Sequence, residues 1–434
     1  MRSLLVASLS LLTAACGSTY MDAPGGADGI SDVARSLSPA EEALALHAAN
    51  QLDLETLDAE LDVRAANGIV DGRPFLDIDS LDAVSYVGAT ALVALADLGV
   101  EHFGTVPHGA QDIPSDTLTL WAANELDQVT LDDVVGLDRR AAENIVAARP
   151  FATVADLDAV SYVGPSALGD LEAYGAGVFG TTCEAGTLLH ADGTTYASLL
   201  EALGYVSGEH DLIACAGTFY GPRPLLGFDG SDVAIYGFGA GQTTFDGMNE
   251  ERFLATVEDG DMVTLYGATF RRAFDLLSPV AVYSGDLQLL ATSFEDNSAS
   301  SGGAVQGGHV TAIRSTFAGN VASWRGGAID ADGATLVDCV FDDNHVEADG
   351  DGSAFYVQGD LRVEGSSLTN HSGPSVVFWD AFGTDVMELS DVTYGTATDA
   401  NLGVGLRVRI DFDATADHDL EGTVSVSCST AGCD

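Results

Sequence analysis

Carboxylates gather around one repeated phrase of the chain. Asp296, Asp342 and Asp343 lie beside the asparagine of Phe-x-x-Asn segments within residues 294–344. Cleavage of a glycosidic bond uses two carboxyl groups held at a fixed separation, so stacked phrases could supply the pair. The chain also carries 66 acidic residues, and with so many carboxylates such neighbours arise by chance. A hydrolytic pair and an ordinary acidic surface therefore both remain open.

A second set of carboxylates alternates with small residues, as in a calcium-binding loop. The set consists of Asp330, Asp332, Asp349 and Asp351. Ca²⁺ prefers carboxylate and carbonyl oxygens, and a lyase would combine it with a basic side chain such as Arg314 or Arg325. The nine histidines show no spacing typical of metal ligands. We expect no cofactor, with bound Ca²⁺ as the alternative.

The charge balance excludes several kinds of chemistry. Among the 434 residues, 66 are acidic and 16 are basic, which gives a net charge of −50. All the basic residues are arginine. A P-loop, a Schiff-base site and a kinase site each need a lysine that is absent here. Such a negative surface also repels phosphate backbones, so no nucleic-acid partner is expected.

Cysteine spacing is typical of an exported protein. Cys183 and Cys215 bracket the start of a β-rich region, and Cys428 and Cys433 lie close together near the end. Each pair could form a disulfide in an oxidising compartment. Cys339 lies in an alternating apolar segment and is expected to be a buried free thiol.

The phrases with carboxylates belong to a repeat that predicts the fold. Phenylalanines recur at steps of 24, 23 and 24 residues, at Phe270, Phe294, Phe317 and Phe341. Alternating apolar residues and glycine-rich turns fill each period and leave no room for a helix. This pattern predicts a parallel β-helix over residues 181–420, with the phenylalanines stacked inside. Asparagines at 297, 320 and 344 should form a second internal ladder.

The start of this region resembles the pectate-lyase-like β-helices. A short amphipathic segment at 194–203, a strand at 211–215 and a Gly-x-Phe-Tyr turn follow one another in the order found there. The Phe-x-x-Asn and Gly-Gly-Ala phrases also look like repeats of polymorphic outer-membrane proteins. The resemblance implies a right-handed winding and a fold that often carries polysaccharide lyases and hydrolases. The phrases typical of polygalacturonases are missing, which favours a non-catalytic protein.

Residues 41–180 contain a duplication. Ile-Val-x-x-Arg-Pro-Phe and Leu-Asp-Ala-Val-Ser-Tyr-Val-Gly occur in both 41–104 and 117–180, joined by a linker at 105–116. Apolar residues at helical spacing indicate short helices. The copies resemble the helix-hairpin-helix modules of competence DNA receptors and type II secretion proteins. None of the four hairpins keeps both glycines with which that family approaches DNA, so we expect structural or protein-docking modules.

The N-terminus has the features of an export signal. Residues 1–15 combine one arginine, an apolar stretch and small residues, and Leu12-Thr-Ala-Ala-Cys16 resembles a bacterial lipobox. The resemblance implies that Cys16 carries lipid, with 16–40 as a flexible tether; cleavage after Ala15 without lipid is the alternative. Residues 421–434 form a C-terminal tail. We expect an exported lipoprotein at the outer membrane or cell surface, anchored in the membrane by its lipid.

These features combine into one functional hypothesis. The predicted architecture is two small helix-hairpin-helix modules followed by a right-handed parallel β-helix. We expect a cell-envelope lipoprotein that acts as a non-catalytic binding or adhesion protein through the β-helix. A carbohydrate or an envelope protein is the expected partner. The alternative is a polysaccharide lyase or glycoside hydrolase on the β-helix.

Overall fold

A computed structural model provides the fold of much of the chain. It describes residues 37–75, 77–103, 107–196, 199, 202, 210–220, 232–249, 254–255, 262–275, 282–347, 352–370, 376–380, 387–390, 393–394, 408–412 and 424–427. The predicted export signal and most of the predicted tether lie outside these residues. The prediction of N-terminal helices followed by a parallel β-helix is confirmed.

The first helical module begins at a well-capped helix. The Ser38 hydroxyl accepts a hydrogen bond from the Glu41 amide, and the Glu41 carboxylate accepts one from the Ser38 amide, which together form a capping box. Its apolar side chains pack into a core centred on the fully buried Leu57, Ile69 and Leu95. The helices are α1 (Pro39–Gln51), α2 (Leu54–Glu60), α3 (Val63–Gly72), α4 (Ile78–Asp82) and α5 (Ala89–Phe103).

The second helical module repeats this order with one local change. Its helices are α6 (Ser115–Glu125), the π-helical turn η1 (Thr130–Val134), α7 (Arg139–Ala148), α8 (Val154–Asp158) and α9 (Pro165–Phe179). The segment between α6 and α7 is two residues longer than the corresponding segment between α1 and α3 of the first module. The wider η1 turn, in place of α2, and Gly136 at φ 86° lie where this extra length falls.

One pair of hydrogen bonds closes each module. Asn50 Nδ2 donates to Phe75 O at 2.8 Å, and the Phe75 amide donates back to Asn50 Oδ1 at 2.9 Å. Asn124 and Phe151 make the same two bonds at 3.0 and 2.8 Å. The repeated Ala-Ala-Asn and Arg-Pro-Phe phrases therefore recur together because each satisfies the other's buried polar groups.

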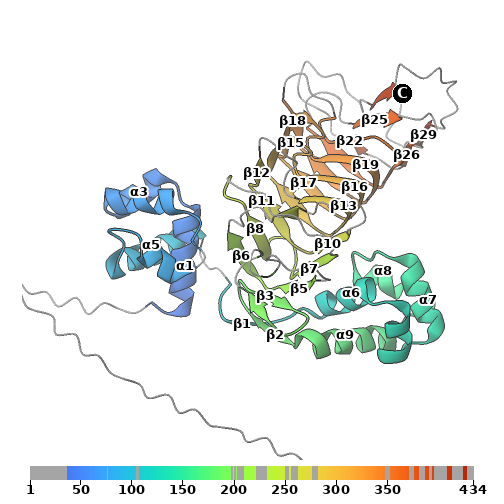
Figure 1. The fold of residues 1–434 in the computed structure, drawn as a ribbon, viewed down its shortest axis with the longest axis horizontal. Helices are drawn as coiled ribbons and strands as arrows, with labels where there is room; N and C mark the ends of the chain where they lie inside the picture. The colour runs from blue at the N-terminus through green and yellow to red at the C-terminus, as the bar shows by residue number, and fades with distance from the viewer. Residues whose placement is uncertain are drawn as a thin grey trace, which may run out of the picture. The chain divides into compact units, whose positions relative to one another are not determined.

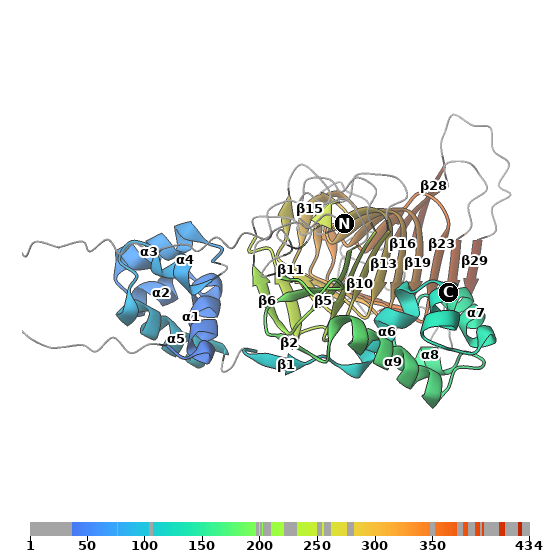
Figure 2. The ribbon, with the colours of Figure 1, turned by 60° about the horizontal axis from the view of Figure 1, so that its bottom comes forward.

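Three sheets form the β-helix, and Figure 1 shows their strands stacked turn upon turn. The strands pair in parallel except for the first strands of the long sheet, which pair antiparallel. The long sheet contains β3 (Leu188–His190), β4 (Thr195–Tyr196), β5 (His210–Ala214), β7 (Val233–Gly237), β9 (Leu254–Ala255), β10 (Met262–Tyr266), β13 (Val282–Leu290), β16 (Val305–Ile313), β19 (Ile329–Val337), β22 (Phe355–Val357), β23 (Leu361–Glu364), β25 (Val376–Asp380), β26 (Met387–Ser390), β28 (Val408–Phe412) and β29 (Val424–Ser427). Figure 2 shows β10, β13, β16 and β19 side by side in this order.

The other two sheets are narrower. The eight-stranded sheet contains β6 (Gly217–Tyr220), β8 (Thr243–Asp246), β11 (Thr269–Arg271), β14 (Ser293–Glu295), β17 (Thr316–Ala318), β20 (Val340–Asp342), β24 (Ser367–Thr369) and β27 (Thr393–Tyr394). The four-stranded sheet contains β12 (Phe274–Asp275), β15 (Ser298–Ser301), β18 (Val321–Arg325) and β21 (His345–Val346). Each turn from β10 to β21 visits the three sheets once, in the order long, eight-stranded and four-stranded.

Identical side chains stack along the interior, as the repeat predicts. Phe270, Phe294, Phe317 and Phe341 pair in direct register, and neighbouring rings lie 4.8 to 5.3 Å apart at angles of 4° to 16°. All four are fully buried. Offset stacking of this kind adds to the free energy gained by burying the rings. The stack continues through Phe245 beyond the predicted column.

The predicted asparagine ladder is also present. Asn297 Nδ2 donates to Asn320 Oδ1, and Asn320 Nδ2 donates to Asn344 Oδ1, both at 2.9 Å. Each amide also donates to a phenylalanine carbonyl one turn earlier, at 2.7 to 3.0 Å. All three side chains are fully buried, so the ladder satisfies backbone groups that would otherwise lie unpaired in the core.

A full turn has three corners, and each described corner in the turns from β10 to β24 places one residue at positive φ. The corner between the long and eight-stranded sheets uses Gly267, Ala291, Arg314, Asp338 and Gly365. The next corner uses Arg272, Asp296, Gly319, Asp343 and Asn370. The third uses Gly302, Gly326 and Gly352. At Gly326 an added Cβ would meet Ile329 O at 2.1 Å, so this third corner requires glycine.

Two strands fall in segments that the sequence assigns to a linker and a tail. β1 (Ala110–Asp112) lies between the modules and pairs antiparallel with β2 (Thr182–Glu184), just before the β-helix. β29 pairs in parallel with β26, so the long sheet continues into residues 421–434. The alternating Val-Ser-Val-Ser of β29 is a strand signal that the assignment to a tail overlooked. The three residues of β1 are too few to alternate, and their pairing depends on a partner distant in the sequence.

Candidate functional site

The structure separates the three carboxylates that could form a hydrolytic pair. Asp342 lies on β20 and stacks in register with Ala318 and Glu295, not with Asp296. Its carboxylate accepts hydrogen bonds from Thr369 Oγ1 at 2.5 Å and from the Asn370 amide group at 2.7 Å. Residues of the next turn therefore bind Asp342 at the C-terminal end of β20.

Asp296 and Asp343 share a column, and Gly319 lies between them. All three have positive φ, where glycine, asparagine and aspartate are the residues tolerated best. Two turns of strand spacing separate the backbones of the two aspartates by roughly 9 to 10 Å. The Asp296 carboxylate lies over Gly319, where an added Cβ would come within 2.5 Å of Asp296 Oδ1, so it fills the space between the two aspartates. The corner by itself explains why aspartate occurs at these positions.

The predicted calcium ligands do not come together among the described residues. Asp330 is buried against Arg325, whereas Asp332 on the same strand is exposed. Asp349 and Asp351 lie outside the described residues. Within the described ranges, no group of three or more acidic, histidine or cysteine side chains is placed to hold a metal ion.

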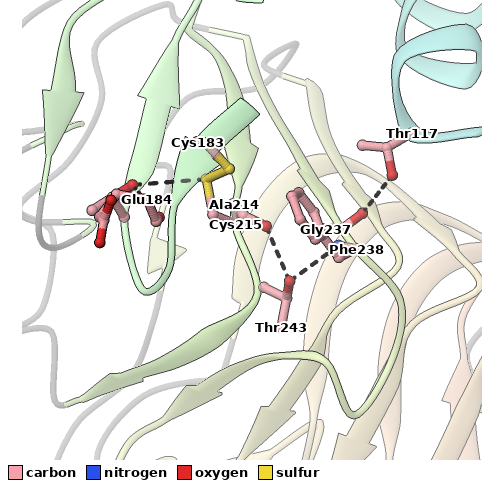
Figure 3. Close-up of a disulfide and its surroundings, with 9 residues drawn as sticks. Thr117, Cys183, Glu184, Ala214, Cys215, Gly237, Phe238 and Thr243 are labelled. Atoms are coloured by element: carbon pink, nitrogen blue, oxygen red, sulfur yellow. Dashed lines mark hydrogen bonds between the residues drawn. A yellow bond between two sulfur atoms is a disulfide. The ribbon is translucent and has the colours of Figure 1, made fainter. Parts of the chain in front are cut away.

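One disulfide joins β2 to the end of β5 (Figure 3). Cys183 and Cys215 are bonded, with their Cα atoms 6.3 Å apart. Beside this bond, Thr243 Oγ1 donates to Ala214 O at 3.0 Å and ties β8 to the same corner. Cys339 is a buried free thiol, as the sequence predicts. Cys16, Cys428 and Cys433 lie outside the described residues.

The second helical module packs directly on the β-helix. Thr117 Oγ1 in α6 donates to Gly237 O on β7 at 3.1 Å (Figure 3). At the other end of α6, Glu125 accepts a hydrogen bond from the Tyr236 hydroxyl at 2.6 Å. Burial raises the pKa of Glu125 to about 7, and the nearby Asp211 adds to this rise while the Tyr236 bond opposes it.

The first helical module meets the β-helix through an ionic cluster. Asp246, whose side chain is fully buried, accepts hydrogen bonds from Arg271 and Arg272 at 2.9 Å. Gln51 at the end of α1 donates to the same carboxylate at 3.0 Å. Burial alone would raise the pKa of Asp246, but the hydrogen bond and charge of Arg272, with the charge of Arg271, outweigh it and lower that pKa.

A histidine lies beside this cluster. His47 in α1 hydrogen-bonds the hydroxyl of Tyr220, and its ring packs edge-on against Phe103. Burial disfavours the imidazolium form, and together with the charge of Arg271 it lowers the pKa of His47 to about 4. The neutral imidazole is therefore the form that fits this contact at physiological pH.

A cleft of about 630 Å³ lies between the second helical module and the β-helix. Small and apolar residues of α7 and of the segments on either side of α8, with Ile313 and Val337, line most of it. At its polar end, Arg314 donates to Thr153 at 2.9 Å and to Asp156 at 2.5 Å. The arginine is thus held by the module itself and supports the packing of the two parts.

An aromatic and ionic cluster on three successive turns forms the best candidate binding site. We call it the Trp324 corner, and it consists of Gln306, Trp324, Arg325, Asp330 and Tyr356. The guanidinium of Arg325 lies 4.8 Å from the centre of the Trp324 ring and 4.9 Å from that of Tyr356. Its Nε donates to Asp330 Oδ2 at 2.9 Å. These contacts hold the Arg325 guanidinium beside both rings in a fixed orientation.

The corner combines an exposed face with a buried anion. The Trp324 side chain is 64% exposed, whereas Asp330 is 1% exposed. Gln306 Nε2 donates to Asp330 Oδ2 at 3.2 Å, and Oδ1 of that carboxylate has no hydrogen-bond partner among the described residues. Burial raises the pKa of Asp330 to about 6, although the charge of Arg325 counteracts part of this rise.

Neither family models, nor curated proteins, nor solved structures give a match to this chain. The interpretation of the site therefore depends on its own geometry. Among the helices that the structure describes, none combines the length and apolar character needed to cross a bilayer.

Sequence reasoning missed the Trp324 corner, although one signal for it is present. Five positions separate Asn297 from Gly302, and six separate Asn320 from Gly326. Eight positions separate Asn344 from Gly352 in the next turn, so this segment lengthens along the β-helix, and the turn with Trp324 carries the first extra residue. A length change at one turn of a repeat often marks a binding face, because it alters the surface and leaves the core columns in register.

Proposed function

We propose that this protein is a non-catalytic binding or adhesion protein of the cell envelope that contacts its partner through the β-helix. The Trp324 corner carries the proposal, because it presents an exposed indole beside an oriented guanidinium on a rigid parallel sheet. Tryptophan, tyrosine and arginine are the residues that contribute most to binding at interfaces. A carbohydrate or an envelope protein is the partner class that we propose.

The finer parts of the proposal come from the sequence. Cys16 would carry lipid and hold the chain at the outer membrane or the cell surface. The β-helix would have the right-handed winding of the pectate-lyase-like fold. The two helical modules, related to helix-hairpin-helix units, would act as spacers or protein-docking units and not as DNA-binding units.

The helix starts of the two modules support this last point. Asp62 precedes α3 and accepts hydrogen bonds from the Arg64 amide and guanidinium at 2.9 Å. Asp138 precedes α7 and makes the same contacts with Arg140 at 2.9 and 3.0 Å. Each carboxylate thus occupies the helix N-terminus to which a phosphate would otherwise bind. With a net charge of −50, this arrangement disfavours nucleic acid.

A polysaccharide lyase or glycoside hydrolase on the β-helix is the second candidate. Its support is the column that Asp296 and Asp343 share on one exposed corner, with Asp342 as the residue before Asp343. An inverting enzyme needs two carboxyl groups roughly 6.5 to 9.5 Å apart on one face, and this corner places two aspartates, two turns apart, on one face.

A combined binding and product assay separates the two functions. The Cys16→Ser chain, which we expect to leave the membrane, supplies soluble protein with every other residue intact. It is incubated with purified envelope fractions and with neutral and acidic polysaccharides, with and without Ca²⁺. We expect retention on at least one of these materials without new reducing ends or unsaturated products. Products that disappear in Asp342→Asn/Asp343→Asn would establish the enzyme instead, and retention on none of the materials would refute the binding function.

A further inference from the structure

The extra residue near Trp324 produces a β-bulge. In the four-stranded sheet, Ala299 on β15 pairs with Ala322 on β18, and Ser301 pairs with Arg325. One residue of β15 between these pairs therefore faces two residues of β18, of which the second is Trp324. A bulge of this kind bends the strand and re-aims side chains, and such bulges are frequent next to binding sites.

The bulge places Trp324 outside the core without disturbing the adjacent columns. Asn320 before it and Gly326 after it keep their places in the ladder and in the third corner. Among the large apolar side chains of the described β-helix, Trp324 is the most exposed, ahead of Val340 at 42% and Phe274 at 36%. A ligand that covers an exposed indole is stabilised on the protein by roughly 25 cal/mol per Å² of apolar area removed from water.

The polar groups of the corner lie on the outer face of the long sheet. Gln306, Asp330 and Tyr356 pair in register on β16, β19 and β22. The residues just before them, Val305, Ile329 and Phe355, point into the core and are fully buried. Because side chains alternate along a strand, the polar column faces outward, where Arg325 lies between it and the Trp324 ring.

This column contains a donor next to an unsatisfied acceptor. Arg325 has further guanidinium N–H groups beyond the Nε that binds Asp330, and its side chain is 20% exposed. Oδ1 of Asp330 has no hydrogen-bond partner among the described residues, so it is an acceptor that a hydroxyl would satisfy once the covering side chains admit it. A donor beside an acceptor matches two neighbouring hydroxyl groups of one sugar ring.

The electrostatics select among sugars. A uronate or a phosphate would bring a negative charge toward Asp330 and toward a chain whose net charge is −50. Arg325 offers limited compensation, because Asp330 already binds it. A neutral ring has hydroxyl groups for the polar column and an apolar C–H face for the indole, and it brings no charge.

We propose that the Trp324 corner binds a neutral pyranose unit of an extended polysaccharide, stacked on the Trp324 indole, with neighbouring hydroxyl groups directed at Arg325 and Asp330. This inference rests on the proposed binding function and gives that function its ligand class. Trp324 supplies the stacking surface, Arg325 donates hydrogen bonds, and Asp330 fixes the guanidinium and accepts from the sugar.

Affinity electrophoresis of the full chain carrying Cys16→Ser tests the proposal. Native gels contain a neutral glucan (hydroxyethylcellulose), a neutral galactomannan or polygalacturonate, each at low and moderate salt. We expect a neutral polymer to retard the chain at both salt concentrations. Trp324→Ala should weaken this binding by about tenfold or more, and Trp324→Tyr should retain part of it. Val340→Ala, at another exposed apolar position of the β-helix, serves as the matched control and should leave migration unchanged.

Each of the other outcomes contradicts one part of the proposal: the site, the ligand class or the binding function. Retardation by a neutral polymer that is equal in wild type and Trp324→Ala removes the corner as the site and leaves the binding function in place. Retardation by polygalacturonate alone overturns the ligand class. Retardation by none of the three polymers refutes the sugar ligand, and retention on envelope fractions then decides separately whether the protein is a binding protein. Arg325→Gln, which keeps a polar side chain, should also weaken binding, and an unchanged affinity would exclude its role.

Discussion

The two helical modules have nearly the same interior but meet the β-helix through different residues. Both close with an asparagine that binds the backbone of a phenylalanine, with bond lengths that agree within 0.2 Å. At the last residue of the first helix, however, Gln51 of one copy corresponds to Glu125 of the other. Gln51 binds the buried Asp246, and Glu125 binds the hydroxyl of Tyr236.

A second position shows the same divergence. His47 in α1 corresponds to Trp121 in α6, and both lie at the start of the repeated Ala-Ala-Asn phrase. His47 contacts Tyr220 of the β-helix, whereas Trp121 is 2% exposed and packs edge-on against Phe179 of its own module. A duplicated fold thus kept its internal hydrogen bonds while its contact residues became specific to two different surfaces.

The largest expected effect is the loss of stability when the asparagine inside either helical module is removed. Asn50→Ala and Asn124→Ala each leave one buried amide and one buried carbonyl of a phenylalanine without partners, which costs about 2 to 5 kcal/mol. We expect the two variants to lose similar local stability, measured by native-state hydrogen exchange in α3 and α7. Asn67→Ala, at an exposed position of α3, is the control and should cost much less. A difference of several kcal/mol between the two asparagine variants would show that the interiors are not equivalent.

The next prediction concerns the interface of the second module. The folded pKa of Glu125, about 7, lies above its ordinary value of 4.5, so the interface favours the protonated acid. Its stability should therefore be highest below pH 4.5 and fall by about 3 kcal/mol as the pH rises to 7, with no further change above.

Glu125→Gln provides the matched control for this pH dependence. The amide oxygen still accepts from the Tyr236 hydroxyl but does not titrate. Hydrogen exchange in α6 and β7, corrected for the intrinsic rate at each pH, should show the decline in wild type and a flat profile in the variant. The same decline in both proteins would assign it to another group.

The interface of the first module should respond in the opposite direction, with a somewhat smaller amplitude because His47 is less deeply buried than Glu125 and solvent screens its charge more. The folded pKa of His47, about 4, lies below its ordinary value of 6.5, so the neutral ring is the stable form. The contact should be fully stable above pH 6.5 and lose about 2 to 3 kcal/mol as the pH falls to 4. The charged groups near this ring are Asp246, Arg271 and Arg272.

His47→Gln should remove the acid sensitivity of α1 in the same exchange experiment. Trp121 occupies the equivalent position in α6 and cannot titrate. This position therefore causes no loss of stability in the second module as the pH falls from 6.5 to 4. An acid-dependent loss of protection in α1 that persists in His47→Gln would contradict the assignment to this histidine.

The difference between contacts that repeat along the chain and contacts that occur once explains how far the sequence could predict the structure. The phenylalanine and asparagine columns were predictable because each turn repeats the residue, and direct register turns a period into a contact. The asparagine and Arg-Pro-Phe phrases of the modules were recognisable as a duplication, although their mutual hydrogen bonds were not. Repetition along the chain therefore predicted what is regular in the fold.

Contacts that occur once had no such signal. Glu125 and Tyr236 are 111 residues apart, and each is unremarkable in its own segment. In the Trp324 corner, Tyr356 comes near Arg325 only because strands β19 and β22 pair. The extra residue beside Trp324 indicated where the surface departs from the repeat, but not which side chains surround it. Positive φ at Asp296 and Asp343 gives a structural reason for residues that the sequence had suggested as catalytic.

The asparagine ladder also bears on how a chain like this can change length during evolution. Each ladder residue occupies the same place in its turn, and Asn297 and Asn320 make the same two bonds to the asparagine of the next turn. Deletion of residues 297–319 would join Asp296 to Asn320 and restore the phrase Phe-Glu-Asp-Asn across the junction. The rod would become shorter by one strand spacing, roughly 4.8 Å, with every column intact. Genetic gain or loss of whole turns can thus move the Trp324 corner nearer to or farther from the helical modules without redesign of the core.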